Sequence, residues 1–280
     1  MSNQLPPQAV VVVPAWRLSG LGGKAELPTP VREVGGEQVV VESVVALSVN
    51  GRTLLRFSCL PDRIEDLALG FLVTEGLVDG PSQVTAVAVA EGKVNVTANV
   101  DFDRFVQFFE TVSMVSGCGR GGSGGGGEEA SRVRSPSRFT PEACLDAMRQ
   151  LEHASSLFRA TGGVHLAALS AGEGLLALAE DVGRHNAVDK VIGGLLRSSS
   201  GQPSLTEVML LSTGRLSREI VAKATRVGIP LLVSRSAPTS AGVTLARRSD
   251  LCLVGFARGQ RLNVYSSPWR LGLPGLAAPA

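Results

Sequence analysis

The sequence of 280 residues lacks a strong excess of charge of either sign, and this narrows the classes of protein that it can represent. Lysine and arginine number 27 and aspartate and glutamate 25, which leaves a net charge of +2. Because concentrated positive charge dominates affinity for nucleic acid, we expect no nucleic-acid partner. No uninterrupted apolar run reaches the ~18 residues of a membrane-spanning helix, so we expect no membrane anchor. Hydrophobic residues at 44% are typical of a globular chain with one large domain or two lobes.

Cysteine is also scarce, and its spacing excludes the common metal-binding patterns. The four cysteines, Cys59, Cys118, Cys144 and Cys252, lie far apart, and the first residues do not resemble a secretory signal. We therefore expect free thiols in a reducing cytoplasm. No Cys-x-x-Cys or His-x-x-x-His spacing occurs, so we expect no metal held by the protein itself.

Changes of composition divide the chain into five segments. Proline and glycine without a sustained period indicate an arm at the start, and a later glycine-rich stretch with little to bury indicates a flexible loop. The predicted segments are an N-terminal arm (1–37), a smaller β-rich α+β lobe (38–115), the flexible loop (116–138), a C-terminal α/β domain (139–270) and a tail (271–280).

The smaller lobe reads as two hairpins that flank a helix. Alternating apolar runs meet at Asn50-Gly51, the dipeptide best suited to a type I′ turn. A one-sided apolar pattern then predicts a helix, with Asp62 and Glu65 in capping-box-like positions and Gly76 at its end. The second hairpin turns at Glu91-Gly92.

The C-terminal domain reads as alternating strands and helices. Thr140 and Pro141 predict the start of a helix that runs to about Ser155. After Glu180 the alternation predicts a largely parallel sheet with flanking helices. Ligands of such sheets bind beyond the carboxyl ends of the strands. The predicted strands are 164–169, 175–179, 208–212, 231–234, 251–256 and 262–265, and the later helices are 186–196, 217–227 and 241–247.

Cys118 differs from the other cysteines in its surroundings. It lies between Gly117 and Gly119 and beside Arg120, whereas the other three have apolar neighbours and are typical of a core. A nearby guanidinium favours the thiolate, and a glycine-rich loop lets a sulfur move between two partners. Cys118 is therefore a candidate nucleophile or sulfur carrier, and the alternative is an incidental thiol on a linker.

A second dense group of polar residues follows the predicted strand that ends near Glu180. His185 could shuttle protons, Asp181 could orient it, and Arg184 or Lys190 could hold an anion at a helix N-terminus. The alternative is an exposed, well-capped helix start with salt bridges.

Two further segments sit at strand ends. Thr213, Gly214 and Arg215 follow an apolar strand and open a helix, an arrangement that presents backbone N–H groups to phosphate; alternatively, Ser217 is an ordinary N-cap. Near the C-terminus, a strand ends in two arginines and a glycine that could clamp phosphate or stack on a base, or form only a basic surface turn. Its residues are Phe256, Ala257, Arg258, Gly259, Gln260 and Arg261. His165, alone in an apolar strand, reads as a core histidine.

Several of these stretches, in this order, resemble the FdhD/NarQ family, over most of the chain from about Glu42 to Ser266. The matching text is VNG at Asn50, DLALGFLVTEGLV from Asp66, GCG around Cys118, TGGVHLAAL from Thr161, EDVGRHNAVDKVIG from Glu180, LSTGRLSREIVAKATRVGIPLLVSRSAPTSAGVTLA from Leu211 and GFARGQRLNVYS from Gly255.

The resemblance implies a cytidine deaminase-like α/β fold and a sulfurtransferase that serves formate dehydrogenase. Sulfur would pass as a persulfide from a cysteine desulfurase to a molybdenum or tungsten bis-guanine-dinucleotide cofactor. By position, Cys118 matches the persulfide-bearing cysteine of the family, and Phe256 to Arg261 match its cofactor-contacting segment. From the strand-end rule, we expect Asp181, Arg184 and His185, with Thr213 to Arg215, to line the same pocket. The resemblance also implies a homodimer.

One departure bears on the mechanism. The family loop typically reads Cys-Gly-x-Cys-Gly, whereas Cys118 is followed here by Gly119, Arg120, Gly121 and Gly122. A dithiol relay in this loop is therefore impossible within one chain, and a single-thiol carrier remains. The alternative is a non-catalytic chaperone that binds and delivers the cofactor, which would tolerate Cys118→Ala. Zinc-dependent nucleobase hydrolysis is excluded because its ligand motifs are absent.

Overall fold

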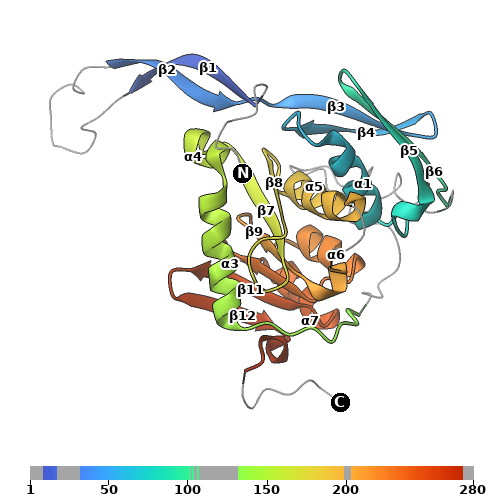
Figure 1. Cartoon of the computed structure of the whole chain (residues 1–280), viewed down its shortest axis with the longest axis vertical. Coiled ribbons are helices and arrows are strands. Elements are labelled where there is room, and N and C mark those ends of the chain that lie inside the picture. Colours follow the sequence, from blue (N-terminus) through green and yellow to red (C-terminus); the bar gives the residue numbers. More distant parts are fainter. Residues whose placement is uncertain are drawn as a thin grey trace.

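A computed structural model provides the structure, and it describes residues 9–17, 32–101, 103, 106, 132–198 and 203–273. A six-stranded sheet forms the centre of the C-terminal domain, and a smaller four-stranded sheet lies beside it with one helix, α1, on its inner face (Figure 1). Among the described residues, no helix combines the length and the apolarity needed to cross a membrane.

The central sheet is mixed. Its strand order is β12-β11-β10-β9-β7-β8, in which β9, β10 and β11 run parallel and the other neighbours antiparallel. The prediction of a largely parallel sheet holds only for those three strands, because β7 and β8 form a hairpin and β12 folds back directly on β11. The bounds are β7 (His165–Ser170), β8 (Ala177–Asp181), β9 (Met209–Ser212), β10 (Leu231–Ser234), β11 (Cys252–Arg258) and β12 (Arg261–Ser266).

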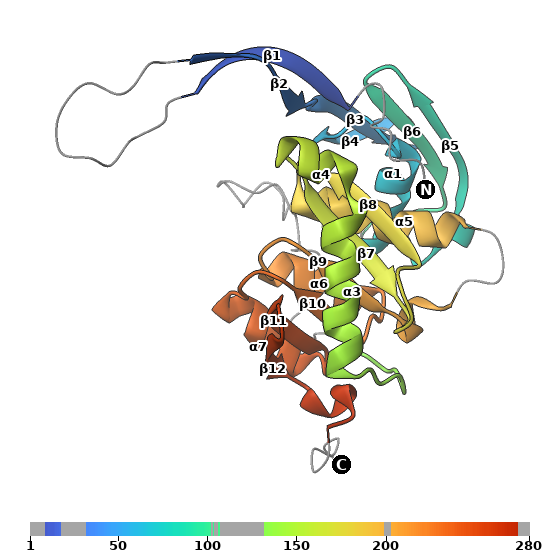
Figure 2. The ribbon, with the colours of Figure 1, turned by 60° about the vertical axis from the view of Figure 1, so that its left-hand side comes forward.

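Helices cover both faces of this sheet (Figures 1 and 2). On one face lie α3 (Pro141–Ala154) and α4 (Ser156–Thr161), and on the other α5 (Arg184–Arg197), α6 (Arg218–Arg226) and α7 (Ser240–Arg248). The predicted cap of α3 is confirmed, since the Thr140 hydroxyl accepts a hydrogen bond from the Ala143 amide at 3.1 Å. The short helix α4 was not predicted. Short 3₁₀ turns complete the domain: η2 (Leu205–Glu207) and η3 (Pro268–Leu271).

The smaller lobe has both predicted hairpins. Asn50 and Gly51 have φ of 49° and 81°, as a type I′ turn requires. The strand β6 also pairs in parallel with β3, which gives the order β4-β3-β6-β5. The bounds are β3 (Ser43–Val49), β4 (Arg52–Cys59), α1 (Ile64–Thr74), η1 (Pro81–Gln83), β5 (Val84–Ala90) and β6 (Lys93–Ala98).

The predicted capping box of α1 is wrong. Arg63, with φ of 49°, is the N-cap, and the cap has no side-chain hydrogen bond among the described residues. Asp62 instead accepts a hydrogen bond from Lys190 of α5 at 2.5 Å, so a tertiary ion pair replaces the local cap. The predicted stop is confirmed, because Gly76 follows the helix with φ of 74°.

The predicted irregular arm is partly a β-ribbon. Residues Val10–Arg17 form β1 and Arg32–Val40 form β2, which pair antiparallel and extend from the body of the molecule (Figure 2). The run of valines in β1 supplies the β-propensity that outweighs the nearby Pro14, and the pairing shifts register at that proline. The base of the ribbon packs on the domain, where a methyl group at Gly163 would lie 2.6 Å from Val40.

The predicted flexible loop is wrong over its last residues, and so is the start of the tail. Val133 is buried in the core, and its amide donates to the Ser249 carbonyl at 2.8 Å. Arg270 donates to the carbonyls of Val133 at 3.0 Å and Ser135 at 2.9 Å, so a buried arginine fixes this segment. Leu271, assigned to the tail, is also buried.

The two lobes meet where α1 crosses α5 at backbone contact. A methyl group at Gly193 would overlap the Asp66 carbonyl oxygen and lie 2.7 Å from the Gly70 nitrogen. A methyl group at Gly70 would likewise overlap the Asp189 carbonyl oxygen. Only glycine at both positions permits this approach, so the lobes are joined as one packed unit.

A buried ion-pair network stands beside this crossing. Lys223 of α6 contacts Asp189 of α5 at 2.9 Å and Glu75, at the end of α1, at 2.6 Å. Thr74 accepts a hydrogen bond from the same ammonium at 2.9 Å and donates to Asp189 at 2.7 Å. Burial raises the pKa of Asp189 to about 6, against the opposing charge of Lys223.

We predict that Gly193→Ala lowers the free energy of unfolding by about 2–3 kcal/mol, because backbone atoms of α1 cannot move aside cheaply. Urea unfolding measures the change. The control is Gly194→Ala, which gains the same helix propensity but would press on the ends of the Arg63 and Asp66 side chains rather than on backbone. Equal effects of the two substitutions would contradict the backbone contact.

Candidate functional site

One edge of the central sheet gathers most of the residues singled out in the sequence. The carboxyl ends of β8, β9, β10 and β11 meet there with the amino ends of β7 and β12. His165 of β7 pairs with Asp181 of β8, and Arg258 pairs with Arg261 across the last hairpin. The segments that begin at Asp181, Thr213 and Phe256 therefore lie along a single edge, as the strand-end rule predicts.

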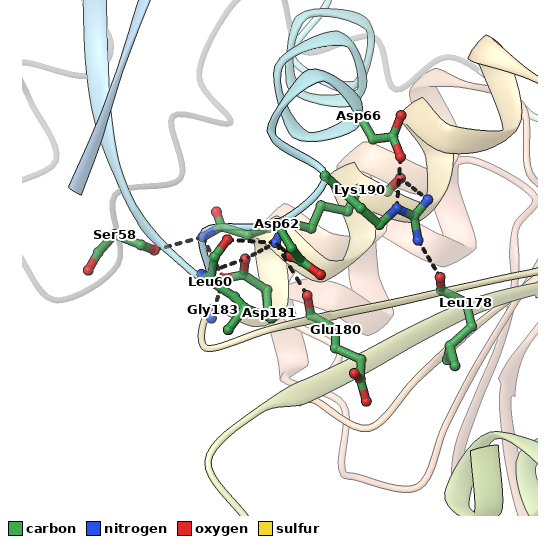
Figure 3. A network of polar contacts seen from close by, with 11 residues as sticks. Ser58, Leu60, Asp62, Asp66, Leu178, Glu180, Asp181, Gly183 and Lys190 are labelled. Atoms are coloured by element: carbon green, nitrogen blue, oxygen red, sulfur yellow. Dashed lines mark hydrogen bonds and ion pairs between the residues drawn. The ribbon is translucent and has the colours of Figure 1, made fainter. Parts of the chain in front are cut away.

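Asp181 and Lys190 form a buried tie between the lobes (Figure 3). Lys190 contacts Asp181 at 2.8 Å and donates to the Leu60 carbonyl at 3.0 Å. Asp181 accepts from the amides of Leu60 at 3.1 Å and Gly183 at 2.9 Å and from Asn186 at 2.9 Å. Burial raises the pKa of Asp181, and the Lys190 ammonium opposes that shift.

This tie corrects two predictions. The side chains of Asp181 and Lys190 have no exposed surface, so neither faces a ligand. The Asp181 carboxylate accepts a hydrogen bond from the Leu60 amide of the smaller lobe rather than orienting His185. The Lys190 ammonium of α5 and the amides of Leu60 and Gly183 are the partners of the carboxylate in place of the neighbouring histidine.

Arg184 and His185 occupy the open start of α5. Gly183 is the N-cap, and within the described chain no side chain caps this end. The stem of Arg184 lies on Gly214, where a Cβ would be 2.9 Å from the arginine Cβ. Arg184 Nε and His185 Nε2 are buried without a hydrogen-bond partner among the described residues. A helix N-terminus with two unsatisfied groups suits an anion.

The pKa values at this corner of the sheet are set by burial and by the neighbouring charged and polar side chains. Burial, then Lys223 and Arg184, lower the pKa of His185 to about 4. Burial and Arg184 also lower the pKa of His165. Arg184 has its pKa lowered by burial and by Arg215. The pKa of Glu219 is lowered despite its burial, because it interacts with Ser217, His185 and Arg184. The histidines are thus neutral at neutral pH, and Arg184 interacts both with the Glu219 carboxylate and, unfavourably, with Arg215.

His165 and Glu219 are the members of this group that the sequence analysis missed. His165 reads as a core residue because its own strand is apolar, and its place follows only from pairing with the end of β8. Its position as the first residue of a strand, one residue beyond two glycines, is the signal that could have marked it.

The loop from Ser212 to Ser217 is held by its own hydroxyls. Thr213 accepts from the Leu166 amide at 3.0 Å and donates its amide to the Leu166 carbonyl at 3.1 Å. Ser212 accepts from the Gly214 amide at 3.0 Å. Thr213 thus continues the sheet, and Gly214 provides the surface on which Arg184 lies. The reading of Ser217 as an ordinary side-chain cap of α6 is wrong, since no such bond exists among the described residues.

The segment from Phe256 to Arg261 forms the β11–β12 turn. Phe256 has φ of 53°, a left-handed conformation that is rare for a bulky side chain. The Arg258 guanidinium lies 5.8 Å from the centre of the Phe256 ring. Ala257 is fully buried, so its methyl group belongs to the core, whereas Arg258, Gly259, Gln260 and Arg261 are exposed. The turn presents an aromatic ring and two arginines beside the same edge.

The described cysteines are all buried, and burial sets their chemistry. Burial raises the pKa of Cys59 and of Cys144 to about 12 and raises the pKa of Cys252 as well. These thiols stay protonated and are inaccessible at neutral pH. Cys118 and Arg120 lie outside the described residues. Within the described ranges no group of three or more His, Cys, Asp or Glu side chains could hold a metal ion.

Comparison with known proteins identifies relatives along most of the chain. Residues 40–272 match the model of the FdhD/NarQ family. A protein of Shouchella clausii named sulfur carrier protein FdhD is 34% identical over 245 residues, which cover 85% of this chain and 91% of the relative. A protein of the same name from Wolinella succinogenes is 34% identical over 239 residues, which cover 84% of this chain and 82% of the relative.

A solved structure supports the same relationship. It is the crystal structure of a protein from Desulfotalea psychrophila assigned as a formate dehydrogenase accessory protein. The two structures superpose with a TM-score of 0.73 at 27% identity, over 94% of this chain and 99% of the other.

We predict that His185 makes stability depend on pH. Its pKa is about 4 in the folded chain and about 6.5 when unfolded, so only the unfolded chain takes up a proton between these values. The free energy of unfolding therefore falls as pH drops from 7 to 4, by at most about 3 kcal/mol from this group.

Urea unfolding of wild type and His185→Gln across this pH range isolates the contribution. The variant should lose less stability at low pH than wild type. His153→Gln, at an exposed histidine of α3, is the control and should follow the wild-type curve. If the His185→Gln curve also parallels the wild type, His185 is not held neutral.

Proposed function

The chain belongs to the FdhD/NarQ family, and from this membership we propose that it is a sulfur carrier in the maturation of formate dehydrogenase. The relatives named sulfur carrier protein FdhD span the same region of the chain, and the solved neighbour is assigned as a formate dehydrogenase accessory protein. The proposal then requires a thiol that can carry sulfur and a place to hold the molecule that receives it.

The burial of three of the four cysteines is the observation that supports the choice of the sulfur-carrying thiol. A sulfur carrier must meet two partners as a thiolate, which excludes Cys59, Cys144 and Cys252 because all three are buried with raised pKa values. Cys118 is the remaining cysteine of the sequence, and it stands in the stretch that resembles the family loop. We therefore propose Cys118 as the persulfide carrier.

The chemistry proposed for Cys118 is thiol–disulfide-type exchange. Its thiolate attacks the outer sulfur of a cysteine desulfurase persulfide, a new S–S bond forms as the old one breaks, and the desulfurase thiolate leaves. Because the loop lacks a second cysteine, release of sulfur depends on an external reductant, a thiol from elsewhere, or capture by the metal of the receiving cofactor.

We propose the sheet edge as the place that holds this substrate, a molybdenum or tungsten bis-guanine-dinucleotide cofactor. Arg184 and Arg215, with the open start of α5, would bind diphosphate, since Arg184 Nε has no partner among the described residues and the two guanidinium groups repel each other there. The exposed arginines of the β11–β12 turn and the ring of Phe256 would bind guanine. His185, neutral at pH 7, would contribute a hydrogen bond rather than charge.

The proposal includes the remaining expectations of the resemblance. The chain would act in the cytoplasm as a homodimer, receive sulfur from a cysteine desulfurase and pass the cofactor on to formate dehydrogenase. The mixed central sheet with helices on both faces would be related to the cytidine deaminase-like fold.

We predict that wild-type protein gains one sulfur atom when incubated with a cysteine desulfurase, pyridoxal phosphate and cysteine, and that Cys118→Ala gains none. Intact-protein mass, with a dithiothreitol-treated sample, measures the gain and its reversal. Cys144→Ala, at a buried thiol, is the matched control and should load like wild type. Equal loading of wild type and Cys118→Ala would refute the assignment, and no loading of either, with nucleotide binding intact, would favour a cofactor chaperone.

We predict that Arg184→Gln weakens binding of guanosine diphosphate (GDP) by about tenfold or more, because a charge-assisted contact to the diphosphate is lost. Isothermal titration calorimetry measures the affinity. The control is Arg132→Gln, which removes the same charge from an exposed arginine that pairs with Asp250 at 3.7 Å, next to the amino end of β11 and so at the opposite edge of the sheet. If both variants bind GDP equally, the diphosphate does not lie at the start of α5.

A further inference from the structure

Three loops at the sheet edge are joined by hydrogen bonds that converge on the loop after β10. This loop belongs to the stretch SRSAPT, which matches the family text and has so far been given no role. The Ser234 hydroxyl donates to the Gly214 carbonyl at 2.7 Å and accepts from the Ser236 amide at 3.0 Å. The Ser236 carbonyl in turn accepts from the Phe256 amide at 3.1 Å.

We propose that Ser234 is the positioning residue of the substrate edge. The identity of the ligand rests on the proposed function, whereas the hydrogen bonds of Ser234 do not depend on it. Its hydroxyl links the loop that supports Arg184 to the loop that holds Phe256. Ser234 has no exposed surface, so it acts on a ligand only through these two loops.

The link matters because the arrangement at each end depends on where its loop is held. Gly214 lies under the stem of Arg184, and Phe256 keeps a left-handed φ that a bulky residue adopts only when its surroundings fix it. Without the Ser234 hydroxyl, the Gly214 carbonyl and the Ser236 amide lose a buried partner. Two bonds further along, from Leu216 to Ala237 and from Thr239 to Leu216, keep the loops attached, so the chain remains folded.

The chain provides a closely matched control in Ser266. Its hydroxyl donates to the Leu251 carbonyl at 2.6 Å and accepts from the Leu253 amide at 3.0 Å, and it is also buried. It lies at the opposite edge of the sheet, where β11 begins. Ser234→Ala and Ser266→Ala therefore remove the same kinds of bond from the same kind of environment, and only the first touches the substrate edge.

The experiment compares wild type with the two variants by melting temperature, amide hydrogen exchange and GDP titration. We expect similar losses of melting temperature in both variants. In Ser234→Ala alone, the amides of Ser236 and Phe256 should exchange about tenfold faster or more, and GDP should bind about tenfold more weakly. If Ser234→Ala does not fold, Ser234→Cys, which fills the position but bonds weakly, replaces it.

Each outcome decides a separate point. Exchange and GDP affinity in Ser234→Ala that match Ser266→Ala would overturn the positioning role. Faster amide exchange with unchanged affinity for GDP would show that Ser234 holds the loops but does not position the ligand, because the loops would then move without weakening GDP binding. If wild-type protein binds no GDP, the cofactor half of the proposed function fails, and the exchange rates still decide whether Ser234 joins the loops.

Discussion

The backbone contact between α1 and α5 is the constraint on which the rest of the molecule depends. Gly70 and Gly193 bring the helices together so closely that α5 belongs to both lobes. Two lysines are buried on either side of this contact, Lys190 against Asp181 and Asp62, and Lys223 against Asp189 and Glu75. Each lysine has one carboxylate partner in the C-terminal domain and one in the smaller lobe, so each network is complete only when both lobes are in place.

This constraint also sets the chemistry at the start of α5. The tie fixes Asp181 and Asn186 to the smaller lobe, so the first turn of the helix cannot rotate. Arg184 and His185 are therefore held at the sheet edge, where Arg184 Nε and His185 Nε2 have no hydrogen-bond partner among the described residues. The stability of the lobe contact offsets the cost of holding two arginines and a buried, neutral imidazole together in the absence of a ligand.

The features predicted correctly from the sequence are those decided within a few residues. Asn50-Gly51 turns a hairpin because both residues tolerate positive φ, and Thr140 caps α3 because its hydroxyl reaches an amide three positions ahead. Asp62 was misassigned because its true partner, Lys190, lies 128 residues away. The common edge of three distant segments was predictable from strand order, whereas the link through Ser234 was not, because a serine reveals its hydrogen bonds only in three dimensions.

The charge available at the sheet edge comes from groups that do not titrate near neutral pH. Burial keeps His165 and His185 uncharged, so the positive potential rests on Arg184, Arg215 and the α5 N-terminus. The electrostatic field at this edge is therefore constant across the physiological pH range. The neutral imidazoles can form directional hydrogen bonds to an anion but add no charge. Such a field would suit the polyanionic substrate of the proposed function, because the field would hold the substrate in one orientation.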